Sequence, residues 1–161
     1  MGKDSNQRNM EIVKITEESI FNAGKIHSES WKESHREFCT EEFIASHTVE
    51  TQIKYIRSGI AQGKDFYMLV DHKPVGIVSV WNDLIENLYV LPGEQRKGYG
   101  TQLLQYVLKQ CNSVPTLWIL SNNKRANAFY KKHGFVESGR RKQLRNDLFE
   151  LEMTRGTNND F

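Results

Sequence analysis

The sequence has 161 residues, of which 26% are charged and 38% hydrophobic, and its formal net charge is +2. This length predicts one domain with a substantial core, and the small net charge disfavours a nucleic-acid-binding protein. There is no run of about 18 apolar residues, no signal-peptide pattern and no metal-type spacing of Cys39 and Cys111. We therefore expect a cytoplasmic protein with reduced thiols, no membrane association and no bound metal.

We expect polar tails at residues 1–9 and 156–161, with a single domain over 10–155. In the first half of this domain, alternating or helical spacing of apolar residues identifies each element. Thr40, followed by two glutamates, predicts the N-cap of a short helix. The other elements are a strand over 10–15, helices over 17–35 and about 49–60, and a strand hairpin over 66–70 and 75–81.

The stretch 83–111 organises the second half, with a strand over 84–90, a short loop over 91–97 and an amphipathic helix. It is followed by a strand over 116–120, a helix over 123–133 stopped by Gly134, and strands over 135–142 and 148–153. The resulting order is β-α-α-β-β-β-α-β-α-β-β. This order favours an α/β (α+β) domain, a mixed sheet with helices on both faces.

The loop delivers the sequence Q-R-K-G-Y-G, at 95–100, to the N-terminus of the following helix. Its glycines allow a ligand to approach the backbone closely, and the first helical N–H groups have no intrahelical partner. Arg96 and Lys97 add positive charge at the positive end of the helix dipole. Such a site suits a phosphate or pyrophosphate.

Two common phosphate motifs do not fit this loop. A P-loop requires a lysine where Tyr99 stands, and a dinucleotide fingerprint requires a third glycine where Leu103 stands. The remaining pattern, Q-x-x-G-x-G between a strand and an amphipathic helix, resembles the acyl-CoA-binding motif of the GNAT-type N-acetyltransferases.

A second motif carries the same resemblance. The sequence N-K-R-A at 123–126, with F-Y at 129–130 and G-F at 134–135, is similar to the family's N-x-R-A-x-x-F-Y…G-F segment. The likeness extends over about 10–154. It implies the GNAT fold, a mixed and mostly antiparallel sheet of six or seven strands with a splayed central strand pair.

The resemblance implies acetyl-CoA as cosubstrate, with the loop amides around its pyrophosphate and the pantetheine arm in the gap between the splayed strands. In the family the matching asparagine contacts the CoA arm, and the matching tyrosine stands near the thioester sulfur. The cofactor-binding residues that we expect are Leu88, Tyr89, Val90, Gln95, Arg96, Lys97, Gly98, Tyr99, Gly100, Thr101, Asn123 and Tyr130.

Acetyl transfer to an amine requires a proton donor for the leaving thiolate, for which Tyr130 is suited, and a donor to the carbonyl oxygen, for which we expect the Val90 N–H. It also requires an acceptor for the amine proton. In some members of the family a glutamate on this strand is the base, which here would be Glu86. Glu86 could instead form an ion pair or face solvent, and Asp83, Glu33, His35 or a water chain are the alternatives.

Period-two alternation places Glu86, Leu88 and Val90 on one face of the strand, unless a bulge breaks the phase.

The acceptor site is expected between about 26–47 and 140–147. The run H-S-E-S-W at 27–31 resembles the H-x-x-S-W helix of small-molecule and polyamine-type members, so we expect a small amine or polyamine-like acceptor. The predicted substrate-binding residues are Trp31, Glu33 and His35. A contrary basic cluster, which either favours an acidic acceptor or simply reaches water, consists of Arg140, Arg141, Lys142 and Arg145.

The alternatives to a small-molecule N-acetyltransferase are a protein or peptide N-acetyltransferase and, in another class, a non-catalytic acyl-CoA sensor. A sensor requires the cofactor loop but not the proton-transfer groups. We expect a monomer or a homodimer.

Overall fold

The computed structural model describes residues 10–156, so the predicted tails, apart from Gly156, lie outside the described residues. Nearly every predicted element is present. The elements are β1 (Met10–Lys14), α2 (Ile20–His35), α3 (Glu41–Ala45), α4 (Val49–Ala61), β2 (Asp65–Asp71), β3 (Lys73–Trp81), β4 (Leu84–Val90), the 3-10 turn η1 (Pro92–Glu94), α5 (Tyr99–Leu108), β5 (Thr116–Leu120), α6 (Lys124–Lys132), β6 (Phe135–Arg145) and β7 (Leu148–Arg155).

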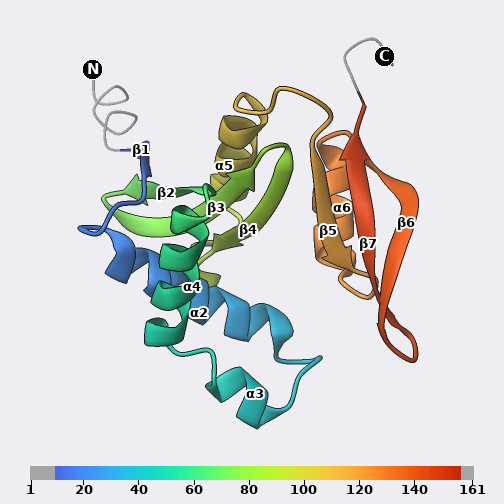
Figure 1. The fold of residues 1–161 in the computed structure, drawn as a ribbon, viewed down its shortest axis with the longest axis horizontal. Helices are drawn as coiled ribbons and strands as arrows, with labels where there is room; N and C mark the ends of the chain where they lie inside the picture. Colours follow the sequence, from blue (N-terminus) through green and yellow to red (C-terminus); the bar gives the residue numbers. More distant parts are fainter. Residues whose placement is uncertain (1–9, 157–161) are drawn as a thin grey trace.

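The strands form one seven-stranded sheet in the order β1-β2-β3-β4-β5-β7-β6 (Figure 1). Neighbouring strands are antiparallel except for β4 and β5, which are parallel. This parallel pair follows from the chain path, because α5 lies between the two strands and returns the chain to the same end of the sheet. The mixed, mostly antiparallel sheet predicted from the sequence is confirmed.

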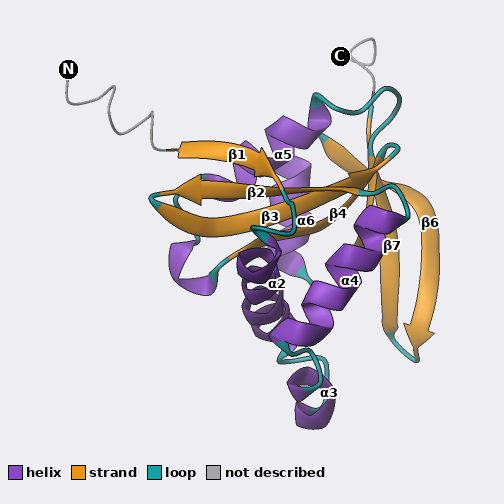
Figure 2. Cartoon of the chain, turned by 60° about the vertical axis from the view of Figure 1, so that its left-hand side comes forward, coloured by secondary structure: helices purple, strands orange, loops and turns teal. Residues whose placement is uncertain are grey.

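Helices cover both faces of the sheet (Figures 1 and 2). On one face α2 and α4 bury a core cluster that includes Ile26, Ile56 and Phe66. On the other face α5 and α6 enclose a larger cluster that includes Leu103 and Phe135. No helix between residues 10 and 156 is long and apolar enough to cross a membrane.

The helix ends follow the local signals in the sequence. Thr40 caps α3 by accepting a hydrogen bond from the Phe43 N–H (3.2 Å), as predicted. Gly134 takes a left-handed φ of 90° after α6, where a residue with a Cβ would be strained. These local interactions explain why the boundaries could be predicted from residue types alone.

All three predicted helices between β1 and β2 are present, and the order written from the sequence left out the short one at Thr40, which is α3. The largest differences in helix boundaries are at α2 and α5. Helix α2 begins at Ile20 rather than at residue 17, because the Ser19 hydroxyl accepts a hydrogen bond from the Thr16 N–H (3.0 Å) and forms a turn there. Helix α5 ends at Leu108, so Cys111 lies beyond it.

Candidate active site

Strands β4 and β5 meet at one end and then diverge (Figure 1). Their register contains the single pair Leu84–Thr116, supported by a hydrogen bond from the Thr116 N–H to the Asp83 carbonyl (2.9 Å). The Asp83 carboxylate accepts from the backbone N–H of Asn112 (2.8 Å) and so holds the loop after α5. A pocket of about 370 Å³ lies at this closed end and is lined by Leu84, Ile85, Glu86, Asn87, Trp118, Lys142 and Glu150.

A β-bulge at Asn87 changes the phase of β4. Asn87 has a φ of 56°, and the register with β3 shifts at the same point. Glu86 points towards Lys64, in the loop between α4 and β2, with a carboxylate oxygen 3.1 Å from the Lys64 ammonium, whereas Leu88 and Val90 pack against the core under α5. The predicted common face of Glu86, Leu88 and Val90 is therefore wrong, because the bulge inserts an extra residue into the alternation.

Asn87 is held by side chains from several elements. Its Oδ1 lies 3.1 Å from His27 Nε2 on α2, and its Nδ2 donates to Ser79 Oγ (3.0 Å) and to the Tyr55 hydroxyl (3.1 Å). Asparagine tolerates a positive φ better than most residues, so these contacts fix a backbone shape that the residue type permits. The sequence analysis missed His27 and Asn87, although an asparagine inside a strand is itself a signal of a bulge.

The buried His27 predicts a loss of stability in acid. It is 4% exposed, and burial lowers its pKa from 6.5 to about 4, so the folded protein keeps the imidazole neutral. The unfolded chain binds this proton at a higher pH, so the stabilisation is fully present above about pH 6.5 and is lost as the pH falls towards 4. We expect a loss of about 3 kcal/mol.

Thermal unfolding measured between pH 7 and pH 4 tests this prediction, because this range spans the interval over which the stabilisation is lost. His27→Gln keeps a donor towards Asn87 but does not titrate, and it should show a shallower decrease of Tm with falling pH. If Tm falls equally steeply with decreasing pH in the native protein and in the variant, groups other than His27 control the loss of stability in acid.

The predicted cofactor loop, residues 91–97, is held in shape by positive φ angles and by the hydrogen bonds of Gln95. Gly98 precedes α5 with a φ of 85°, and Arg96 also takes a positive φ of 66°. The Gln95 amide donates to the Val90 carbonyl (3.2 Å) and accepts from the Arg125 guanidinium (3.1 Å). Gln95 thus links the end of β4 to the start of α6, which orients the loop between the two.

Lys97 is engaged with a carboxylate of the same loop. Its ammonium lies 2.8 Å from Glu94, which also pairs with Lys73 at 2.8 Å. Hydrogen bonds from Lys73 and Lys97 lower the pKa of Glu94 to about 2. The charge of Lys97 is thus partly neutralised, so Arg96 is the better candidate for a direct contact with a phosphate.

The first turn of α5 packs closely against its neighbours. The Tyr99 hydroxyl donates to the Asp71 carboxylate (2.5 Å), and Thr101 Oγ1 lies 3.2 Å from His133 Nε2. A Cβ added to Gly100 would lie 3.4 Å from an aromatic ring of α6. The side chains of Tyr99 and Thr101 are therefore engaged within the protein, and the first N–H groups of α5 have no intrahelical partner.

Helix α6 contributes the tyrosine that the family motif singles out. The Tyr130 ring packs edge-on against Phe129 (5.1 Å) and Phe135 (5.7 Å), and burial raises the pKa of its hydroxyl. The hydroxyl therefore stays protonated at neutral pH and can donate a hydrogen bond. Asn123 caps α6 through its Oδ1, which accepts from a backbone N–H of the first turn (3.0 Å). Tyr89 faces α2, with its ring 5.1 Å from that of His27.

The predicted acceptor residues on α2 do not stay together. Trp31 is stacked between His35 (4.1 Å between ring centroids) and His47 (3.5 Å), which joins α2 to the end of α3. Glu33 is exposed and pairs with Arg36 (3.6 Å) on the solvent side. The structure thus groups Trp31 and His35 but leaves Glu33 outside the cluster.

Several pocket residues lay outside the predicted site. Trp118 and Glu150 come from β5 and β7, which are joined only through the pairing of the sheet. Neither residue belongs to a recognisable motif, so no local signal in the sequence marks them. Among residues 10–156, no group of three or more His, Cys, Asp or Glu side chains is placed to hold a metal ion.

Comparison with known proteins identifies the fold and gives a family match over part of the chain. The family model described as "Acetyltransferase (GNAT) domain" matches residues 62–137, which contain the predicted cofactor loop and the whole of the second motif. No curated protein sequence matches the chain.

Solved structures match almost the whole chain. The PaiA N-acetyltransferase from Thermoplasma acidophilum in complex with coenzyme A has a TM-score of 0.69 and 22% identity, over 89% of this chain and 97% of that chain. The ribosomal-protein-S18-alanine N-acetyltransferase from Escherichia coli has a TM-score of 0.67 and 19% identity, over 91% and 92%. YncA from Salmonella typhimurium, with its cofactor acetyl-CoA, has a TM-score of 0.67 and 16% identity, over the same shares of 91% and 92%.

At these identities the structural likeness shows the fold, while the family match covers the loop and the start of β6. The splayed β4–β5 pair and the left-handed glycine before α5 agree with both findings. Residues 62–137 thus match the GNAT acetyltransferase domain, and the whole chain has the fold of solved GNAT-type N-acetyltransferases.

Proposed function

We propose that this protein, through a single domain over residues 10–155, transfers an acetyl group from acetyl-CoA to a primary amine, by direct attack of the amine in a ternary complex. The observation that carries the proposal is the gap between β4 and β5, which opens beside the glycine-bearing start of α5. An extended pantetheine arm fits such a gap because β4 presents unpaired backbone groups along it.

The backbone of β4 supplies the donors that the thioester needs. The Leu91 N–H donates to the Val75 carbonyl on β3 (2.9 Å), and amides alternate in direction along a strand. The N–H groups of Leu88 and Val90 consequently point towards the gap. We assign the pantetheine contacts to this segment and the stabilisation of the carbonyl oxyanion to the Val90 N–H.

Tyr130 is the proposed proton donor to the departing thiolate. It lies on α6, next to the gap, and burial keeps its hydroxyl protonated. Arg96 and the N–H groups of 98–101 are the proposed contacts for the pyrophosphate, because they combine a charge with unpaired donors at a helix N-terminus.

Glu86 is the proposed acceptor of the amine proton, directly or through water. The bulge directs it into the pocket, on the face opposite Leu88, where an amine could approach the thioester from the α2 side. Asp83 is less suitable because its carboxylate is bound to the backbone of the loop after α5.

Replacement of Glu86 by Gln should lower kcat/KM by about 10- to 100-fold at neutral pH, as expected for loss of a general base. Part of the rate should return at higher pH, because more of the acceptor is then already neutral. The pH profile of kcat/KM measures this effect, and Lys64→Met, which removes only the ion-pair partner, is the control. If kcat/KM of the Gln variant still falls at low pH as it does in the native protein, Glu86 has a structural role.

The acceptor is proposed to be a small amine. The structural neighbours include an enzyme named for a ribosomal protein, so a protein or peptide acceptor is the second candidate. A panel of polyamines, aminoglycosides, amino acids and peptides, assayed by release of the free CoA thiol, distinguishes the two. Binding of acetyl-CoA without thiol release on any acceptor would instead favour a non-catalytic sensor.

A further inference from the structure

The pocket at the closed end of the β4–β5 gap contains an aromatic ring and a carboxylate on one face of the sheet. In the antiparallel pairing of β5, β7 and β6, Trp118 is opposite Glu152 and Lys142 is opposite Glu150. Residues that are opposite each other, or two apart on one strand, share a face. Trp118, Glu150 and Lys142 therefore point to the same side of the sheet, and all line the pocket.

Lys142 shows that this ring accepts an ammonium group. The Nζ of Lys142 lies 5.7 Å from the centroid of the Trp118 ring, within the range of a cation–π interaction. Lys142 is exposed on an edge strand, and its long side chain can leave the ring at little cost. Trp118 lies on a central strand and is the fixed part of the contact.

Glu150 is the carboxylate of the pocket that has not been neutralised. Glu86 pairs with Lys64 (3.1 Å), and the neighbouring Glu152 pairs with Arg140 (3.5 Å). Glu150 is half-buried and makes no ion pair within residues 10–156. An ammonium group placed between Trp118 and Glu150 would gain a cation–π contact and a carboxylate together.

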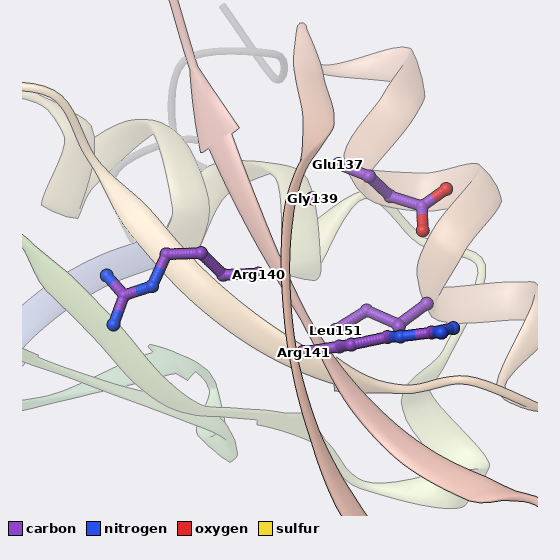
Figure 3. Close-up of a pocket in the computed structure, with 5 residues that line it drawn as sticks. All are labelled: Glu137, Gly139, Arg140, Arg141 and Leu151. Atoms are coloured by element: carbon purple, nitrogen blue, oxygen red, sulfur yellow. The ribbon is translucent and has the colours of Figure 1, made fainter.

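The basic cluster noted in the sequence does not form an anion site here. Arg140 and Arg141 point to opposite sides of β6, where Arg141 lines a separate pocket with Glu137 (Figure 3). Arg141 lies over the Phe149 ring (4.7 Å), and Arg145 donates to the Phe38 carbonyl (2.9 Å). Among the residues that line the pocket at the closed end of the β4–β5 gap, Lys142 is the cation; it makes no ion pair within residues 10–156 and lies over an aromatic ring.

Resting on the acetyl transfer proposed above, we propose that Trp118 and Glu150 form a cation subsite for a second ammonium group of the acceptor. Lys142 occupies this subsite until the acceptor displaces it. The acceptor is then a diamine or a longer polyamine, with one amine neutral at the thioester and the other held as an ammonium between the ring and the carboxylate. Lys142 acts as an internal competitor that raises the KM for such acceptors.

The test compares 1,4-diaminobutane with n-butylamine, which has the same chain length and lacks the second ammonium. For the diamine, Glu150→Gln and Trp118→Leu should each raise KM by about 2- to 30-fold. Lys142→Met should lower it, because the competing ammonium is gone. The KM for n-butylamine should change little in all three variants. Glu137→Gln, which removes a carboxylate from the other pocket, is the matched control.

Calorimetric titration of the diamine into the CoA-bound protein gives a second readout that needs no turnover. A raised KM or weaker binding in Lys142→Met would overturn the proposal in favour of an anionic group on the acceptor. Equal effects on both amines would also overturn it, because the residues would then act on folding or on the thioester. Acetylation of n-butylamine without any preference for the diamine would refute the subsite and leave the proposed function intact. Diamine binding that depends on Glu150, without thiol release, would refute the proposed acetyl transfer and leave the subsite intact.

Discussion

Tyr130→Phe is expected to lower kcat by about 10- to 1,000-fold, in the range of general-acid effects, and to leave acetyl-CoA affinity little changed. The substitution keeps the ring that packs against Phe129 and Phe135 and removes only the hydroxyl. Because burial raises the pKa of that hydroxyl, it is protonated at the pH of the assay and can donate to the leaving thiolate. Steady-state kinetics with thiol detection measures the effect.

Tyr106→Phe is the control for loss of a tyrosine hydroxyl elsewhere, because Tyr106 lies on α5 with its ring against Tyr67 (4.9 Å). Tyr89→Phe tests the neighbouring phenol, which lies on β4 and faces His27. Single-turnover measurements establish that chemistry limits the rate. If turnover is then unaltered in the Tyr130 variant but falls in the Tyr89 variant, the donor is Tyr89.

The parts of the fold that were predictable depend on short-range signals. Strand β4 has the bounds predicted from its β-forming residues, and α6 begins after the Asn123 cap and ends before Gly134. The loop before α5 was predictable for the same reason, because the left-handed Gly98 lies directly next to the helix N-terminus. In each case the decisive interaction spans only a few residues.

The parts of the site that were not predictable depend on contacts between distant segments. The bulge at Asn87 is held by His27 from α2 and Tyr55 from α4, and no pattern within β4 specifies those partners. The phase of Glu86 changes with that bulge, so its surroundings could not be derived from alternation alone. Trp118 and Glu150 meet only because β7 inserts between β5 and β6.

The surroundings of the basic residues near the proposed acceptor site also could not be predicted from the sequence. Arg140, Arg141 and Lys142 are consecutive and read as one basic cluster, but the strand alternation directs Arg141 to the side opposite Arg140 (Figure 3). Each then acquires a different neighbour, which is a carboxylate for Arg140 and an aromatic ring for the other two. The charge that a ligand meets is therefore set by the pairing of strands.

The cofactor loop gives the second large effect. Saturating acetyl-CoA should raise the Tm of the native sequence by about 5 to 10 °C, since a ligand at about 100 times its Kd adds about 2.7 kcal/mol to the stability. Gly98→Asp should abolish this shift. A Cβ at this position meets nothing within 4 Å, so the new side chain extends into the space in front of α5, where it would repel a pyrophosphate.

Gly98→Asn is the matched control, because asparagine has nearly the same size as aspartate and tolerates the φ of 85° about as well. Both variants should lose a similar amount of stability without ligand, since both side chains are strained to a similar extent at a positive φ. The difference between them in the presence of acetyl-CoA then isolates the charge. A smaller but measurable Tm shift for Asn, with none for Asp, is the expected result. If the Asp variant folds and shows the full shift, the pyrophosphate does not lie at the start of α5 and the assignment of the loop is wrong.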